Sequence, residues 1–204
     1  MFTSYPNAAK GLKMIFTGQI LSIIGMVLTV LGAAMTVASM LAGGSGAVGI
    51  VAILGLIAVI AAYVMEIVGL SRASNDDANY RIALGAAVAA LVVSILSSAI
   101  KNEILSTLLS IVTTLLNFVV VNNVCQTSGN LLHSLGNDTL ANRGATISKI
   151  YFVCTIVSVV CTVVDLIPFL NALSSIVSFV AAIATLVGYI MYLTFLSSGS
   201  KALT

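Results

Sequence analysis

A carboxylate inside an apolar stretch has the clearest chemical potential in this sequence. Glu66 lies in the apolar run 47–71. An ionisable side chain within a membrane-spanning helix is costly, and it is by default a hypothesis for an ion, proton or ligand site. Glu66 lies within one to two turns of the end of this run. We therefore favour the alternative that it reaches the interface or forms a structural ion pair with Lys10 or Lys13 on the preceding segment.

Amide side chains form the second candidate for a ligand or ion contact. Three of them cluster toward the end of the apolar segment 104–124: Asn117, Asn122 and Asn123. The polar stretch 125–133 follows, and it ends in the only histidine, His133. We expect this stretch to be either a helical extension or a solvated loop, and in either case a candidate contact for a partner. His133 is expected to be exposed.

Several classes of chemistry lack the residues they need. The sequence has no His-x-x-x-His, no Gly-x-Ser-x-Gly and no phosphate-binding Walker loop, so we expect no enzyme, no metal and no cofactor. Cys154 and Cys161 are roughly 10 Å apart on one expected helix, too far for a disulfide. The net charge of +2, without a basic run, also argues against nucleic acid as a partner.

The elements that must position Glu66 and the asparagines are membrane-spanning helices. The chain is 60% hydrophobic and 7% charged, against roughly 25% charged in soluble domains. Each of its six apolar segments has a length of about 18 residues or more, enough for the roughly 20 residues that cross a bilayer. These segments are 14–41, 47–71, 82–100, 104–124, 150–167 and 172–195. We predict an all-α polytopic integral membrane protein with one transmembrane domain over 1–204, surrounded by the lipid bilayer.

Basic residues predict the orientation in the membrane. Seven of the eight are expected on the side of the termini: Lys10, Lys13, Arg72, Arg81, Arg143, Lys149 and Lys201. Only Lys101 falls on the other side, where Asp165 is its expected partner. The positive-inside rule then places both termini in the cytoplasm, and we expect a plasma-membrane location. The six tyrosines are expected on the same side, as half of an aromatic belt.

The breaks between the segments predict three helical hairpins. Short breaks at 43–46, 101–103 and Pro168 alternate with the longer polar segments 72–81 and 125–149. Ser71, Ser134 and Ser197 are spaced by 63 residues, and Tyr63 and Tyr189 by twice that number. We predict tandem repeats at about 1–76, 77–138 and 139–204, related by a pseudo-threefold axis along the membrane normal.

Small residues follow one face of several segments at alternating steps of three and four. The first segment has Gly18, Ser22, Gly25, Thr29, Gly32, Thr36 and Ser39. The second has Ala52, Gly55, Ala62, Glu66, Gly69 and Ala73, with Val59 as the exception. Such a stripe is typical of close helix packing in lipid. We expect packing here, with a polar path between the helices as the alternative.

Two functions are compatible with these features. We expect a small structural or interaction protein of the membrane, either a subunit of a complex or a homo-oligomer, because small-residue stripes dominate and charge inside the spans is scarce. The alternative is a small-molecule transporter, or the membrane substrate-binding subunit of one, in which Glu66 and the asparagines contact the solute.

Overall fold

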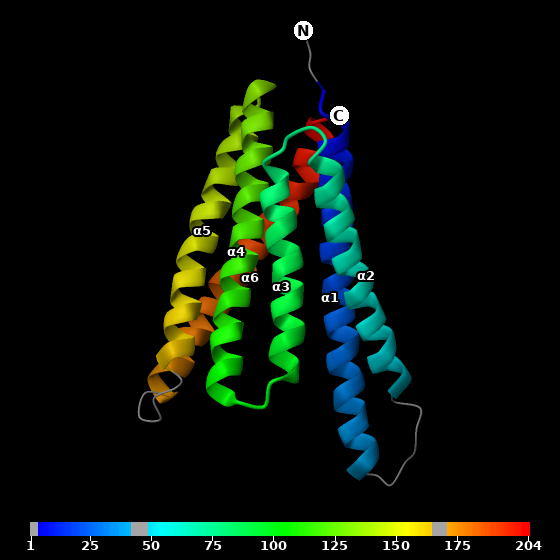
Figure 1. Cartoon of the computed structure of the whole chain (residues 1–204), viewed down its shortest axis with the longest axis vertical. Coiled ribbons are helices and arrows are strands. Elements are labelled where there is room, and N and C mark those ends of the chain that lie inside the picture. The colour runs from blue at the N-terminus through cyan, green and yellow to red at the C-terminus, as the bar shows by residue number, and fades with distance from the viewer. Residues whose placement is uncertain (1–3, 42–48, 165–170) are drawn as a thin grey trace.

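The computed structural model describes residues 4–41, 49–164 and 171–204, and these form six long helices (Figure 1). Their bounds are α1 Pro6–Leu41, α2 Gly49–Ala73, α3 Tyr80–Ala99, α4 Glu103–Ser134, α5 Asp138–Val164 and α6 Asn171–Ala202. Each has a stretch long and apolar enough to cross a membrane. The prediction of an all-helical, multi-pass architecture is therefore confirmed.

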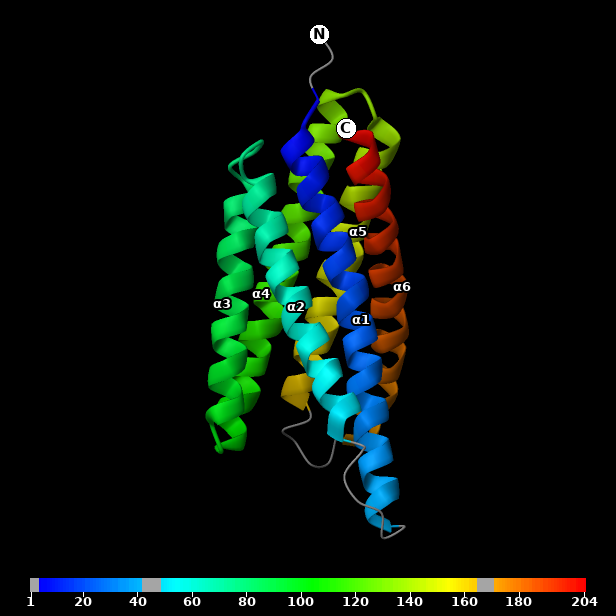
Figure 2. The same ribbon diagram turned by 90° about the vertical axis from the view of Figure 1, so that its right-hand side faces the viewer.

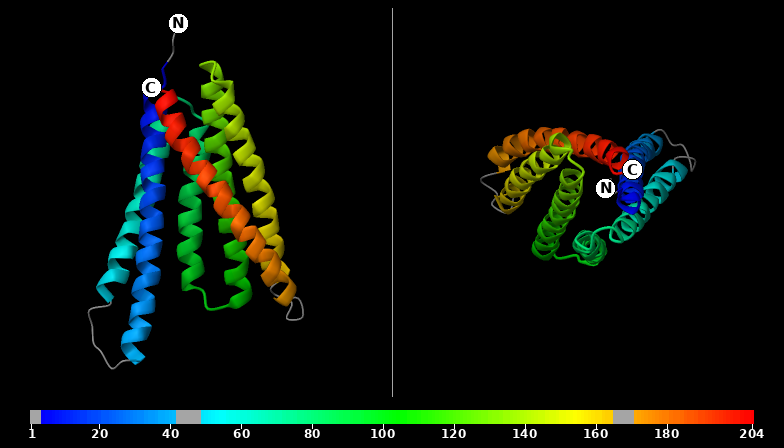
Figure 3. Two further views of the ribbon diagram at one scale, coloured as in Figure 1. Left: turned by 180° about the vertical axis from the view of Figure 1, so that it is seen from behind. Right: turned by 90° about the horizontal axis from the view of Figure 1, so that it is seen from above.

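The helices form a ring in chain order. Each helix packs against the next, and α6 returns to pack against α1. Figure 2 shows α1 between α2 and α6, and the view from above in Figure 3 shows the ring. The contact between α1 and α2 is the most extensive, and that between α2 and α3 is the sparsest of the ring. The ring thus contains one tightly packed helical hairpin and one loosely packed boundary.

The bundle is closed at the end where both chain termini lie, here called the terminal end (Figure 1). Leu12, Leu70, Leu132 and Leu196 are fully buried in a shared core there. Toward the opposite end α1 and α2 diverge from the other helices, and apolar side chains become exposed. Val30, for example, is 67% exposed. Exposure of so large an apolar surface to water is unfavourable, so we expect lipid to cover it.

Backbone and side-chain hydrogen bonds hold the terminal end together. The amide of Tyr5 donates to the carbonyl of Leu203 at 3.0 Å. Asp76, between α2 and α3, accepts from the amide of Ala8 at 2.7 Å and from the side chain of Asn7 at 2.8 Å. A carboxylate at a helix N-terminus satisfies free amides and complements the helix dipole. The α2–α3 connection therefore positions the first turn of α1.

The small-residue stripes of α1 and α2 pack directly against each other, as predicted. A Cβ added at Gly25 would lie 2.8 Å from the carbonyl oxygen of Gly55 and 2.8 Å from a methyl carbon of Val59. Val59, the exception in the pattern, therefore fills the space that Gly25 leaves open. The same antiparallel match recurs along the hairpin, where Gly11 meets Gly69 and Gly18 meets Ala62. These stripes act in packing within the chain.

The predicted polar segment 125–149 is almost entirely helical, so the expectation of a long loop there is wrong. Helix α4 continues to Ser134 and α5 begins at Asp138, with a tight turn between them. Gly136 makes the turn possible, because its φ of 77° is a conformation that side chains disfavour. His133 is exposed, as expected, and contacts Asp138. Of the two alternatives for 125–133, the helical extension is confirmed.

Burial explains why this extension is helical. Cys125, Thr127, Ser128 and Leu132 are all buried, and the hydroxyl groups of Ser128 and Tyr80 share a hydrogen bond of 2.7 Å. Buried polar groups are stable only when they are paired in this way. The extension therefore packs against α3 and belongs to the core of the terminal end.

The buried Tyr80–Ser128 pair gives a testable energy. Ser128→Ala or Tyr80→Phe should each lower the free energy of unfolding by about 1–2 kcal/mol, because each leaves one buried hydroxyl unpaired. The double variant should lose less than the sum, because it removes both partners. Thermal unfolding in detergent, with the four proteins compared, measures this coupling. Strictly additive losses would contradict a hydrogen bond between the two side chains.

The basic residues lie mainly in one half of the bundle. The segments with seven basic residues all lie in the terminal half of the bundle, and Lys101 lies in the α3–α4 connection at the opposite end. The expected Lys101–Asp165 pair involves Asp165, which lies outside the described residues. All three cysteines are free and buried, and Cys154 and Cys161 are not bridged, as their spacing predicted.

Candidate functional site: a polar cavity inside the ring

A cavity of about 310 Å³ lies inside the ring, and all six helices contribute to its lining. We call it the central cavity. Its main lining residues are Gln19 and Met26 of α1, Tyr63 and Glu66 of α2, Ala87 of α3, Asn117 of α4, Tyr151 of α5, and Thr185, Tyr189 and Tyr192 of α6. Ligand sites in helical membrane proteins are built in this way, from side chains of facing helices.

Within the part of the chain that the structure describes, Glu66 is the only Asp, Glu, Lys, Arg or His side chain that lines the central cavity. It lies about 10 Å along α2 from the end of that helix, at 1.5 Å per residue. Its Oε2 accepts a hydrogen bond of 3.2 Å from the amide nitrogen of Gln19. Among the described residues, no hydrogen bond reaches its other oxygen, Oε1. The carboxyl group thus keeps one oxygen without a hydrogen-bond partner among these residues.

Gln19 joins three helices at this point. While its Nε2 donates to Glu66 of α2, its Oε1 accepts from the hydroxyl group of Tyr189 of α6 at 2.9 Å. The same hydroxyl lies 3.2 Å from the backbone carbonyl of Gln19. The network α2–α1–α6 therefore fixes the position of the carboxyl group and closes the ring where α6 meets α1.

The expected ion pair of Glu66 with Lys10 or Lys13 is wrong. Both lysines are exposed on α1, and they lie about two turns closer to the terminal end than Gln19. Within the described part of the chain, the only ion pair joins His133 and Asp138. The physical reason is the rotation of each helix about its axis. Glu66 lies on the face of α2 that borders the central cavity, whereas Lys10 and Lys13 lie on the exposed face of α1.

The tyrosines correct a second expectation. Tyr63, Tyr151, Tyr189 and Tyr192 line the central cavity, so they are not an aromatic belt facing lipid headgroups. The rings of Tyr151 and Tyr192 are in edge contact, with centroids 6.1 Å apart. Tyr192 is 1% exposed, and its hydroxyl has no partner among the described residues. A buried hydroxyl group without a partner is costly, and a hydrogen bond from a bound molecule would offset this cost.

The structure separates the three candidate asparagines. Asn117 lines the central cavity together with Glu66. Asn122 accepts hydrogen bonds from Ser148 of α5 and from Gln126, and Asn123 donates to the carbonyl of Val119. Neither Asn122 nor Asn123 lines the central cavity. Their hydrogen bonds within and between α4 and α5 account for them as packing residues, and Asn117 alone remains beside Glu66.

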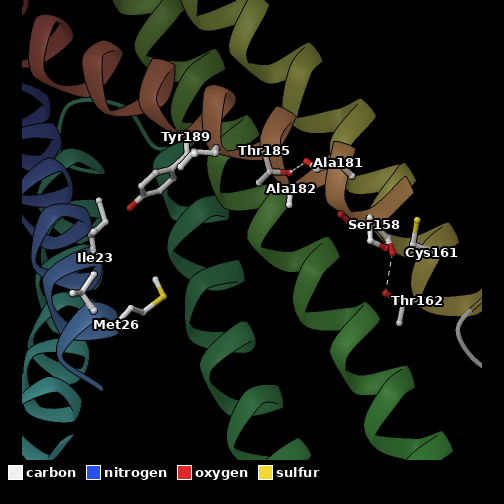
Figure 4. Close-up of a pocket in the computed structure, with 12 residues that line it drawn as sticks. Ile23, Met26, Ser158, Cys161, Thr162, Ala181, Ala182, Thr185 and Tyr189 are labelled. Carbon is white, nitrogen blue, oxygen red and sulfur yellow. Dashed lines mark hydrogen bonds between the residues drawn. The ribbon is translucent and has the colours of Figure 1, made fainter. Parts of the chain in front are cut away.

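A larger apolar cavity adjoins the central one. It has a volume of about 610 Å³ between α1 on one side and α5 and α6 on the other, and we call it the apolar wedge. Figure 4 shows Ile23 and Met26 across from Ser158 and Thr162. Met26, Thr185 and Tyr189 line both spaces, so the two are neighbours with a shared wall. A side pocket of about 180 Å³ between α4 and α5 also includes Thr185.

The hydroxyl-bearing stripe of α5 faces these spaces. Tyr151 lines the central cavity, Thr155 the side pocket, and Ser158 and Thr162 the wedge. These residues of α5 therefore border cavities, whereas the small-residue stripe of α1 packs against α2. The surroundings differ because α1 has a close partner in α2, whereas α5 and α6 diverge from α1.

A separate groove of about 440 Å³ lies at the terminal end of the α4–α5 hairpin. We call it the polar groove, and its lining includes Gln126, Asn130, His133, Asp138 and Asn142. It contains part of the stretch 125–133 that the sequence identified as a possible partner contact. Among the described residues, no three His, Cys, Asp or Glu side chains come together in a way that could hold a metal ion.

Sequence reasoning missed Gln19 and the inward direction of the tyrosines. Gln19 is the only glutamine in the run 14–41, and a polar amide within a spanning helix is a usable signal. The spacing of Tyr63 and Tyr189, noted as repeat evidence, also holds for Glu66 and Tyr192. All four line the central cavity.

Comparison of the chain with protein-family models, curated proteins and solved structures finds no match.

Proposed function

We propose that this protein binds a small molecule in the central cavity and acts as a membrane transporter, or as the substrate-binding subunit of one, without covalent chemistry. The observation that carries the proposal is a cavity lined by six helices around one carboxyl group. A carboxyl group within a membrane-spanning helix is costly in free energy, and such a group is by default a hypothesis for a functional site. Gln19 donates only one hydrogen bond to this carboxyl group, so a bound molecule can provide further hydrogen bonds or a positive charge.

The packing of the hairpin also supports this function over a purely structural one. The most regular small-residue stripes, those of α1 and α2, pack against each other and are not presented to another protein. Transport further requires that helices separate and close around the solute. The sparse α2–α3 contact and the divergence of α1 from α5 and α6 supply boundaries at which this can occur.

Native mass spectrometry of protein released from its membranes in mild detergent tests the proposal. We expect the wild-type chain to carry a small-molecule adduct. Thr185→Phe should reduce adduct occupancy at least fivefold, because Thr185 lines the central cavity, the wedge and the side pocket. The matched control is Val187→Phe, on an exposed position two residues away, which should keep the adduct. A bare wild-type chain, or an adduct that survives Thr185→Phe, would contradict the proposal.

The second candidate is the structural or interaction protein that composition favours. The polar groove on the α4–α5 hairpin is the observation in its favour, because it offers hydrogen-bonding side chains and the exposed His133–Asp138 pair to a partner. In the same mass measurement this function predicts several copies of the chain, or a second polypeptide, in place of a small adduct.

We also infer the orientation and the repeat. The location of the basic residues supports cytoplasmic termini, and the plasma membrane is the membrane in which we expect the protein. Two pairs spaced by 126 residues, Tyr63 with Tyr189 and Glu66 with Tyr192, line one cavity from α2 and α6, which supports a common origin for the first and third hairpins. The corresponding residues of α4, Gln126 and Gly129, line the polar groove instead, so the middle hairpin has diverged most.

A further inference from the structure

We propose that the central cavity and the apolar wedge together bind a lipophilic organic cation, with its charged centre beside Glu66 and the tyrosine rings and its apolar substituents in the wedge. This inference rests on the proposed function and specifies the class of its ligand. Such a ligand is both positively charged and largely apolar. Glu66 and the tyrosines account for the charge, and the wedge accounts for the apolar part.

Charge complementarity identifies the cation. Among the described residues, neither the central cavity, the wedge nor the side pocket has a lysine, arginine or histidine in its lining, and Glu66 is their only carboxylate. A buried carboxylate is compensated best by an opposite charge in direct contact. An anionic guest would instead meet Glu66 with no cation to balance it. The free Oε1 of Glu66 is the atom that a positively charged group would approach.

Aromatic rings extend the site for a cation that has apolar substituents. Tyr63, Tyr151, Tyr189 and Tyr192 line the same space as Glu66. The face of an aromatic ring attracts a cation within about 6 Å, most strongly in a site without water, and it does so for quaternary groups that cannot donate hydrogen bonds. A small metal ion would need several oxygen ligands around it, whereas this cavity has a single carboxylate and hydroxyl or amide groups on different helices.

The wedge supplies the apolar part of the site. Most of its lining surface is apolar, and the lining includes Ile23, which is labelled in Figure 4, together with Val27 and Leu186. Two of its polar members, Thr185 and Thr162, donate their hydroxyl groups to backbone carbonyls of their own helices, at 2.8 Å each. The hydrogens of these two hydroxyl groups are therefore already used within the protein. Because Met26, Thr185 and Tyr189 border both spaces, one molecule can reach from Glu66 into the wedge.

Binding of tetraphenylphosphonium to purified protein in a neutral detergent tests the cation. We expect saturable binding, at least tenfold weaker binding by Glu66→Gln, and near wild-type binding by Glu66→Asp. The isosteric glutamine removes the charge while keeping an oxygen for Gln19, and a melting curve checks that each variant is folded. Asp138→Asn is the matched control, because it removes an exposed carboxylate outside these cavities.

Two comparisons make the test decisive. Neutral triphenylphosphine oxide should compete at least tenfold more weakly than tetraphenylphosphonium. In the series tetramethyl-, butyltrimethyl- and octyltrimethylammonium, competition should strengthen with chain length in wild type and lose that dependence in Thr185→Phe. Equal binding by wild type and Glu66→Gln, or by the neutral analogue, would overturn the inference. If the native adduct persists while these cations fail to bind, the proposed function stands and only the ligand class is wrong.

Discussion

Gly25→Leu is expected to lower the free energy of unfolding by about 3 kcal/mol or more, enough to prevent stable accumulation of a marginal membrane protein. The α1–α2 contact at this point is between backbones. An added Cβ would lie 2.8 Å from the carbonyl oxygen of Gly55, and a leucine adds three further carbons. Backbone atoms cannot move aside as a flexible side chain can, so the two helices must separate.

The chain provides a matched control for this substitution. Gly85 lies in α3 with nothing within 4 Å of an added Cβ. Gly85→Leu should therefore change stability by less than about 0.5 kcal/mol, or raise it, because leucine favours the helix more than glycine does. Thermal unfolding in detergent compares the two variants. Equal melting temperatures would show that α1 and α2 do not pack through the glycine stripe.

The second large effect concerns Gln19. Gln19→Leu should lower the free energy of unfolding by about 2–3 kcal/mol, because it removes the donor to Glu66 and the acceptor of Tyr189 at once. Glu66 is partly buried, and a carboxyl group that loses its partner within a membrane-spanning bundle is costly. The measurement is again thermal unfolding, supplemented by the native-mass adduct, which should fall because Glu66 and Tyr189 lose their fixed positions.

A double variant distinguishes this network from general packing. Gln19→Leu combined with Glu66→Leu replaces both partners with apolar groups and should recover at least half of the stability lost in Gln19→Leu. Gln126→Leu, at an exposed glutamine whose partner is Asn122, is the control and should cost less than about 1 kcal/mol. An unchanged melting temperature in Gln19→Leu, or no recovery in the double variant, would contradict the network.

The fold was largely predictable because its main determinants are local. Apolar length identifies a spanning helix without reference to other residues, and the three-and-four spacing of glycines predicts a close neighbour. The exception was the stretch 125–149, where low hydropathy suggested a loop. That stretch is helical because Tyr80 and the core of the terminal end bury Cys125, Ser128 and Leu132, and such burial depends on residues far away in sequence.

The candidate site was only partly predictable. The sequence by itself determined that Glu66 is inside a spanning helix and faces a neighbour, because both follow from composition and period. Only the tertiary structure decided that this neighbour is Gln19 and not a lysine, that four tyrosines turn inward, and that Asn117 belongs to the cavity while Asn122 and Asn123 do not. The physical reason is that the direction of each side chain depends on the rotation of its helix, and packing between all six helices determines that rotation.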